Sequence, residues 1–531
     1  MKRLPLHVAL VITLFGTAAG VSAKNLVVCT EASPDGFDIA RYTTAVTADA
    51  AAETLFNRLA DFAPGTTDVV PALAERWDIS PDGLEYTFYL RPGVKFHTTR
   101  YFKPTRTLNA DDVVWSFQRQ LDPNHPWHSS SLIGYPYFES MGFKTLLKRI
   151  EKVDDLTVKI TLNNAEAPFL RDVAMAFTSI YSAEYADQLL KAGKTEDLNS
   201  KPIGTGPFSF MRYSKDAQVR FKANPDYFRG EPPSDSLIFA ITTDSNVRLQ
   251  KLKANECQIA VAPKPDDVKH LRTDPNLKVD ERAALITSYI AINTLHPYLD
   301  DVRVRKALNL AFDRRTYLNS VHGEGNAVEA VNPYPPTLLG FNTRLENPPR
   351  DLAKARALLK EAGVPEGHVF TLFTRNGGGA SNPNPLLAAQ LLQADLAKIG
   401  LTLDIRVMEW GEMLKRTKKG EHDMVSVGWA GDNGDPDNFM TPLLGCPAAQ
   451  NGENYARWCN KDFDALITKA RTLTEPAERA ALYEQAQVIF HQDSPWINVV
   501  HPKLFTAMRK NVEGYTLSPL TNNNFATTQV K

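Results

Sequence analysis

Three aspartates, Asp432, Asp435 and Asp437, lie within the stretch GWAGDNGDPDNFM, which spans residues 428–440. Glycine, proline and asparagine surround them, so the stretch is typical of a turn and not of a helix interior or a central strand. Carboxylates gathered in this way could bind a metal ion, transfer protons, hold one cationic group of a ligand, or only stabilise the turn itself.

The spacing of these aspartates does not fit a calcium-binding EF-hand loop. Counted from Asp432, such a loop needs an oxygen-bearing side chain at the third position, where Gly434 stands, and a glutamate at the twelfth, where Leu443 stands. The sequence also has no H-E-x-x-H or G-x-S-x-G motif, no Walker loop and no dinucleotide fingerprint. We therefore predict no catalytic residue, no metal site and no cofactor.

Residues 1–23 have the pattern of a secretory signal peptide. Lys2 and Arg3 form a basic start, an apolar run follows, and small residues precede a cleavage site of the A-x-A type after Ala23. The apolar run is too short for a stable membrane span, and no cysteine that could carry a lipid follows the cleavage point. We expect an exported, soluble protein that begins at Lys24.

The charge and length of the mature chain limit its function and its organisation. Removing Lys2 and Arg3 leaves 58 basic against 61 acidic side chains, a net charge of −3. Such a balance offers no electrostatic surface for nucleic acid or anionic membrane. The 508 residues that remain exceed a single core, so we expect two or more domains. No low-complexity linker separates them, which predicts domains connected by chain crossing.

The four cysteines fit an oxidising compartment. They allow three disulfide pairings. Cys446 and Cys459 close a short loop just after the aspartates, which leaves Cys29 and Cys257 to pair across a long separation. A metal site is the competing interpretation, but no C-x-x-C motif or nearby histidines support it.

Alternating helix and strand patterns predict an α/β fold. Residues 351–363 and 388–400 carry apolar residues at helical spacing, and each pattern ends at a glycine. Residues 401–407 switch to a period of two, and residues 423–431 form a further strand that runs directly into the aspartate stretch. In mixed sheets of this kind ligands bind beyond strand ends, so the aspartates lie where ligand groups are usually placed.

Three further elements are predicted in the N-terminal part. Residues 25–31 form a buried strand, and residues 84–97 form a hairpin that turns at a Pro-Gly pair. Residues 108–121 form a helix with Asn109 as its N-cap and acidic residues in the first turn.

Five segments spread along the chain carry a recognisable pattern. They read ALAERWDISPDGLEYTFYLRPGVKFH at 72–97, LNADDVVWSFQR at 108–119, PIGTGPF at 202–208, NPDYFRG at 224–230 and DDVRVRKALNLAFDR at 300–314. Together they resemble family 5 of the bacterial extracellular solute-binding proteins, the peptide-binding components of ABC importers. The resemblance covers essentially the whole mature chain. CTEASPDGFD, FKPTRTLNADDVV, GDNGDPDNF and the four cysteine positions are similar to the periplasmic dipeptide-binding members.

This resemblance implies a two-lobed α/β periplasmic binding protein of type II, from the large cluster with an extra subdomain. Lobe I would comprise residues 24–283 plus 503–531, with the extra subdomain near 56–180, and lobe II residues 284–502. Ligand would be trapped between the lobes by hinge closure. The expected disulfides match the family pattern. The family also implies a periplasmic monomer that delivers its ligand to an inner-membrane ABC permease.

The resemblance implies that Asp432 pairs with the α-ammonium group of a peptide ligand. Physical chemistry agrees, because the α-amino pKa is about 8, so the group is cationic at neutral pH. An enclosed cation needs a fixed anion. Gly431 and Trp429 lie beside Asp432, and Thr43 and Thr44 occupy a family position near the ligand. A core tryptophan and strand-end threonines remain the alternative interpretations.

Asp435 and Asp437 have a simpler interpretation than Asp432. Short acidic side chains in a turn commonly accept hydrogen bonds from their own backbone, so we expect turn and cap residues here.

The chain departs from the dipeptide-binding pattern at the ligand's carboxylate end. The relatives place an arginine three residues before an Asn-Pro-Asn run, as a bidentate clamp for the carboxylate. Here the run is present at 382–384, but the clamp position is Gly379. Arg375 lies four residues earlier and would have to reach back from a glycine-rich loop. The alternative is an open end that accepts longer peptides or a non-peptide amine.

Two classes of function follow from these patterns. The first is a binding protein that captures di- and tripeptides by their free amino end for import, with a carrier of haem or of another non-peptide ligand as the alternative within the family. The second is an exported hydrolase, for which the sequence offers no nucleophile–base pair. We expect a binding protein and not an enzyme.

Overall fold

The computed structural model describes residues 24–131 and 134–531. The signal peptide predicted for residues 1–23 lies outside this range. Within the described residues, no helix combines the length and the apolar character needed to cross a membrane.

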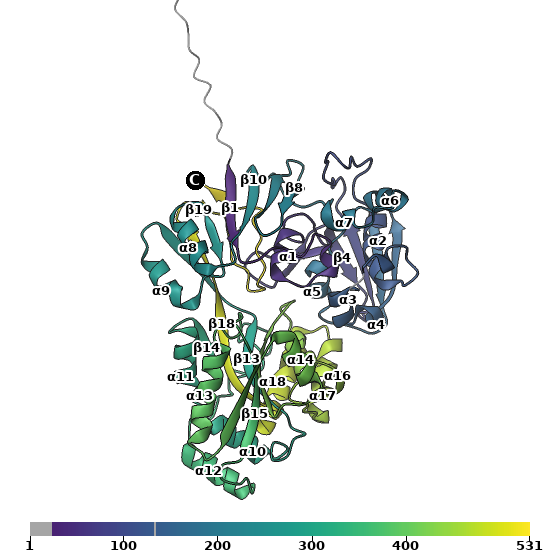
Figure 1. Ribbon diagram of the computed structural model, residues 1–531. Helices are drawn as coiled ribbons and strands as arrows, with labels where there is room; N and C mark the ends of the chain where they lie inside the picture. The colour runs from purple at the N-terminus through teal and green to yellow at the C-terminus, as the bar shows by residue number, and fades with distance from the viewer. Residues whose placement is uncertain (1–23, 132–133) are drawn as a thin grey trace, which may run out of the picture.

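Two lobes share one twisted sheet (Figure 1). Its strands run in the order β16-β15-β17-β13-β18-β11-β1-β10-β9-β8, and β12 and β14 also pair with β18. The long strand β18 (Trp496–Arg509) connects the lobes, since its first half pairs with β13 and its second half with β12. The alternating elements predicted from the sequence therefore build the two-lobed α/β fold.

The first lobe contains the first and the last of the described residues, Lys24 and Lys531. Strand β1 lies parallel to β10 and β11 at the centre of its half of the sheet, and the strand predicted at 25–31 is confirmed as β1. The elements of this lobe outside the extra subdomain are β1 (Asn25–Thr30), η1 (Ile39–Arg41), α1 (Ala45–Ala50), β2 (Ala60–Phe62), β3 (Val69–Pro71), β8 (Phe208–Ser214), β9 (Gln218–Ala223), β10 (Ser236–Ile241), α8 (Ser245–Lys253), β11 (Ile259–Val261), α9 (Pro265–Thr273), β12 (Leu277–Ala283), β19 (Val512–Glu513) and β20 (Gln529–Val530).

An extra subdomain inserted in this lobe has its own four-stranded sheet, in the order β4-β5-β7-β6. Helix α2 is capped by Asn109 through a complete capping box with Asp112, as the sequence predicted. The elements are β4 (Ala74–Ile79), β5 (Glu85–Leu90), α2 (Ala110–Leu121), η2 (His128–Ser130), α3 (Pro136–Ser140), α4 (Phe143–Leu146), β6 (Leu147–Asp154), β7 (Thr157–Leu162), α5 (Phe169–Asp172), η3 (Ala176–Thr178), α6 (Ala183–Lys191) and α7 (Asp197–Ser200).

The hairpin predicted at 84–97 is wrong in its second arm. Strand β5 pairs with β4 and β7, and the residues after the Pro-Gly turn form no strand. Val94 and Phe96 are nevertheless buried, and the backbone N–H of His97 donates to the carbonyl of Gly204. The alternation of buried residues reflects packing against a loop and not strand pairing.

The second lobe is built around β13, whose seven residues are all buried between β17 and β18. The helices and strands predicted at 351–363, 388–400, 401–407 and 423–431 are confirmed as α12, α13, β16 and β17. The elements are β13 (Ile286–Ile292), α10 (Val302–Ala311), α11 (Arg314–Tyr317), η4 (Leu318–His322), β14 (Ala327–Glu329), α12 (Leu352–Glu361), β15 (Val369–Arg375), α13 (Pro385–Ala397), β16 (Thr402–Met408), α14 (Trp410–Lys418), β17 (Met424–Ala430), α15 (Asp437–Leu444), α16 (Ala448–Asn451), α17 (Lys461–Thr472) and α18 (Pro476–Asp493).

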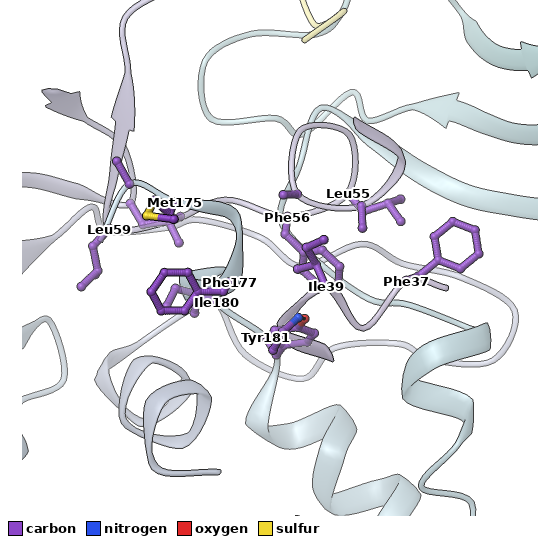
Figure 2. Close-up of a cluster of buried hydrophobic side chains, with 14 of the residues drawn as sticks. Phe37, Ile39, Leu55, Phe56, Leu59, Met175, Phe177, Ile180 and Tyr181 are labelled. Atoms are coloured by element: carbon purple, nitrogen blue, oxygen red, sulfur yellow. Dashed lines mark hydrogen bonds between the residues drawn. The ribbon is translucent and has the colours of Figure 1, made fainter. Parts of the chain in front are cut away.

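Each lobe has its own hydrophobic core. The first includes the cluster shown in Figure 2, in which Phe56, Phe177 and Tyr181 pack beside Ile39 and Met175. The second lobe has separate buried clusters on its sheet. Separate cores allow each lobe to move as a unit about the strands between them.

Both disulfides predicted from the sequence are present. Cys29 is bonded to Cys257 and ties β1 to the segment before β11. Cys446 is bonded to Cys459 and closes a loop between α15 and α17 in the second lobe.

Candidate functional site

Asp432 lies just beyond the end of β17, where the chain turns toward α15. The Asn438 side-chain oxygen accepts hydrogen bonds from the backbone N–H of Asp432 at 3.0 Å and from Nε1 of Trp429 at 3.3 Å. Gly431 leaves room for the ring of Phe439, since a Cβ atom there would lie 2.6 Å from it. These local contacts fix the direction in which the Asp432 side chain leaves the turn.

The Asp432 carboxylate is half-buried and faces the other lobe. The hydroxyl of Tyr137, from α3, donates a hydrogen bond to its Oδ1 at 2.9 Å. Burial raises the pKa of Asp432 to about 6, although hydrogen bonds from Tyr137 and Asn438 act in the opposite direction. Among the described residues, no basic side chain forms an ion pair with this carboxylate. Asp432 is therefore an anion supported only by neutral donors.

Asp432 lines a cavity together with residues of the first lobe. Thr43 and Thr44, which precede α1, are exposed and lie in the wall of this cavity, so the structure brings these predicted residues together with Asp432. The lining residues are Ile39, Tyr42, Thr43, Thr44, Ala45, Ala48, Glu53, Phe62, Tyr137, Ala174, Met175, Ala176, Asp432, Leu520, Thr521 and Asn522. Trp429 and Gly431 support Asp432 from behind and do not line this cavity.

Asp435 and Asp437 point away from this cavity into the second lobe. Asp435 accepts a hydrogen bond from the backbone N–H of Asp437 at 2.9 Å, as expected of a turn residue. It also forms a buried, two-pronged ion pair with Arg479 at 2.8 and 2.9 Å, which the sequence did not predict. Asp437 accepts from the hydroxyl of Thr441 at 2.5 Å. Both aspartates therefore hold the turn that carries Asp432.

A second set of contacts joins the lobes beside Asp432. Arg471 of α17 donates to both carboxylate oxygens of Glu166 at 3.0 Å, and the Asn433 side-chain amide donates to Asp172 at 2.7 Å. Burial raises the pKa of Glu166 to about 7 and raises the pKa of Asp172, while Arg471 opposes the rise at Glu166. These residues are up to 305 positions apart, and no local pattern pointed to them.

Arg375, the residue named from the sequence as a replacement for the clamp arginine missing at Gly379, lies close to that position. It ends β15, and its guanidinium lies 4.8 Å from the centre of the Trp410 ring. Its Nη1 lies 3.2 Å from the point where a Cβ of Gly379 would be, and its Nε has no hydrogen-bond partner among the described residues. Arg375 does not line the cavity at Asp432, so the structure places it apart from the amino-end residues.

The described residues contain no group of three or more His, Cys, Asp or Glu side chains arranged to hold a metal ion.

Comparison with known proteins places the chain in one family. The profile "Bacterial extracellular solute-binding proteins, family 5 Middle" matches residues 68–451. A relative called "Di/tripeptide-binding protein 4" from Pseudomonas aeruginosa is 64% identical over 531 residues, which cover 100% of this chain and 99% of the relative.

Solved structures of similar proteins have the same fold. HbpA2 from Haemophilus parasuis has a TM-score of 0.90 at 44% identity and covers 96% of this chain and 100% of its own. A dipeptide-binding protein from Pseudoalteromonas sp. SM9913, in complex with Met-Leu, has a TM-score of 0.83 at 37% identity, covering 96% and 100%. The chain belongs to family 5 of the bacterial extracellular solute-binding proteins.

Proposed function

We propose that this protein is the substrate-binding component of an ABC importer and captures di- and tripeptides by their free α-amino end. The single observation that carries the proposal is Asp432, a half-buried carboxylate between the lobes with no cationic partner among the described residues. The names of the Pseudomonas relative and of the Pseudoalteromonas complex support a peptide as the ligand.

The chemistry of Asp432 fits an ammonium group. A buried carboxylate without a cation is unfavourable, and its raised pKa records that cost. A ligand ammonium would supply the missing charge and form short, charge-assisted hydrogen bonds. Thr43 and Thr44 in the facing wall would contact the same end of the ligand from the first lobe.

Arg375 is proposed as the cation for the ligand's carboxylate. Its stacking on Trp410 keeps the guanidinium close to Gly379, and its unpartnered Nε leaves a donor for an anion. Because the arginine lies at a strand end before a glycine-rich loop, we expect weaker selection at this end of the ligand than at Asp432.

The finer assignments of location, partner and domain boundaries are part of the proposal. We propose that the protein works in the periplasm as a monomer and delivers its ligand to an inner-membrane permease. The chain crosses between the lobes near residues 283–286 and 500–503, where the pairing of β18 changes from one lobe's strands to the other's. This supports lobe I as 24–283 plus 503–531 and lobe II as 284–502. The extra subdomain, predicted near 56–180, is proposed to comprise the elements from β4 to α7, residues 74–200.

A thermal-shift screen tests this function. The protein is first unfolded and then refolded, so that any co-purified ligand is removed. Free di- and tripeptides should raise the melting temperature by mass action, and N-acetylated peptides should not. Peptide amides should give smaller losses than acetylated peptides. Mass spectrometry of the same mixtures should show intact peptides. A visible absorption band on the purified protein, or a shift with haem but with no peptide, would contradict the proposal.

A further inference from the structure

The cavity at Asp432 has a wall made by the last part of the chain. Leu520, Thr521 and Asn522 line it, although they follow β18 by more than ten residues and belong to no helix or strand. The sequence patterns gave no indication of this segment. We call residues 520–524, which include these three residues and the two asparagines after them, the C-terminal corner.

The C-terminal corner is held by two buried acidic side chains, Asp49 of α1 and Glu53, and Glu53 also lines the cavity. The side-chain amides of Asn522 and Asn524 donate to the two carboxylate oxygens of Glu53 at 2.9 and 3.2 Å. Asn523 donates to Asp49 through its backbone N–H at 2.6 Å and its side chain at 2.8 Å. Three consecutive asparagines thus fix the position of the corner relative to the cavity.

The backbone of the corner is strained at Thr521. Its φ is 65°, in the left-handed region that a β-branched residue rarely adopts. Such conformations persist only when surrounding contacts enforce them, and they concentrate at ligand sites. The contacts to Asp49 and Glu53 enforce it here.

The corner also has unused hydrogen-bonding groups. Glu53 accepts hydrogen bonds, so the amide nitrogen of Asn522 must face it and the Oδ1 atom must point elsewhere. That Oδ1 atom is shielded from solvent and has no donor among the described residues. Within the same part of the chain, no protein group pairs with the backbone N–H or C=O of Thr521 or Asn522. Buried polar groups without partners are uncommon in native proteins.

We infer that the C-terminal corner is the part of the first lobe that recognises the ligand's main chain, with Oδ1 of Asn522 accepting a hydrogen bond from the first peptide N–H. This inference rests on the proposed function. Asp432, in the second lobe, binds the ammonium group of the ligand. Asn522, in the first lobe, accepts a hydrogen bond from the neighbouring peptide bond. Because every peptide has this N–H, the contact selects peptides over other amines without selecting their side chains.

The test compares Ala-Ala with L-alanyl-L-lactate, in which an ester oxygen replaces the peptide N–H. Calorimetry on refolded protein should show the ester binding about tenfold more weakly, the usual effect of one lost hydrogen bond. In Asn522→Ala the two ligands should bind equally. In Asn511→Ala, a control that loses a surface hydrogen bond to the carbonyl of Lys531 outside the corner, the tenfold difference should remain. Asn522→Leu, which has a similar size and no acceptor, gives the same comparison if the alanine variant does not fold.

Two results would overturn the inference: equal binding of both ligands to the wild type, or a preference for Ala-Ala that survives in the Asn522 variants. Failure of the proposed function is a separate result, since Ala-Ala itself would then not bind to the wild type.

Discussion

The hydroxyl of Tyr137 donates a 2.9 Å hydrogen bond to Oδ1 of Asp432, a residue 295 positions later in the chain and on the opposite lobe. Burial and the nearby carboxylate raise the pKa of Tyr137 well above its ordinary value, so the phenol stays protonated and remains a donor. This contact couples the anion that we propose for ligand binding to the approach of the two lobes.

Tyr137→Phe should weaken peptide binding about tenfold and raise the pKa of Asp432 by about one unit. The variant removes a hydrogen bond that favours the charged carboxylate, and a bond to a charged group contributes roughly 1.5 kcal/mol or more. Calorimetric titrations between pH 5 and 8 measure both effects. An unchanged affinity and pH midpoint would show that the hydroxyl does not act on Asp432.

Asp432→Asn should stabilise the protein without ligand at pH 8, by up to about 3 kcal/mol. The folded-state pKa is raised from 3.8 to about 6, so the protonated form is favoured by folding. This contribution is fully present below pH 3.8 and is lost as pH rises through 6. Melting curves should therefore differ between variant and wild type at pH 8 and coincide near pH 3.5. A less stable variant at pH 8 would contradict the electrostatic interpretation.

Peptide affinity should fall about tenfold for each pH unit below 6, because the ligand's ammonium stays charged while Asp432 takes up a proton. It should fall again above about pH 8, where the ligand's amino group loses its proton. Glu166 has a pKa of about 7 and also titrates near the lobe interface, so its effect must be separated. In Glu166→Gln the decline below pH 6 should persist. Its disappearance would assign the pH effect to Glu166.

Arg471→Ala should weaken peptide binding about tenfold, although Arg471 does not line the cavity at Asp432. The change leaves Glu166 without its ion-pair partner at the interface between the lobes, and breaking such a pair is costly even when one partner is a third exposed. Small-angle scattering with bound peptide should show a larger fraction of open molecules.

Arg344→Ala is the matched control for this prediction. Its ion pair with Glu484 lies within the second lobe and on the surface, at 2.8 Å. It should leave affinity and scattering unchanged. If Arg344→Ala and Arg471→Ala changed affinity and scattering equally, the contact between Arg471 and Glu166 would not be the cause of the weaker binding.

The features that could be predicted from the sequence are those with a local or periodic signal. Asn109 caps α2, residues 401–407 form β16, and β17 leads into the turn of Asp432, because each depends on neighbouring residues. The 84–97 hairpin failed since Val94 and Phe96 alternate for a different reason, burial against a loop.

The parts of the site that could not be predicted depend on long-range contacts. Tyr137 meets Asp432, and Arg471 meets Glu166, only after both lobes have formed. The asparagines at 522–524 had no periodic pattern, and their role follows from Asp49 and Glu53, more than 460 positions away. Asp432, Thr43 and Thr44 were predicted from the family resemblance. The structure shows in addition that all three line one cavity.

The central claim is that Asp432 binds the positive end of a peptide. Isothermal titration of refolded protein with Ala-Ala and with N-acetyl-Ala-Ala tests it most directly. Acetylation removes the charge and should leave the carboxylate unpaired, a cost of roughly 3–5 kcal/mol or at least about a hundredfold in Kd. Equal affinities for the two ligands would contradict the account.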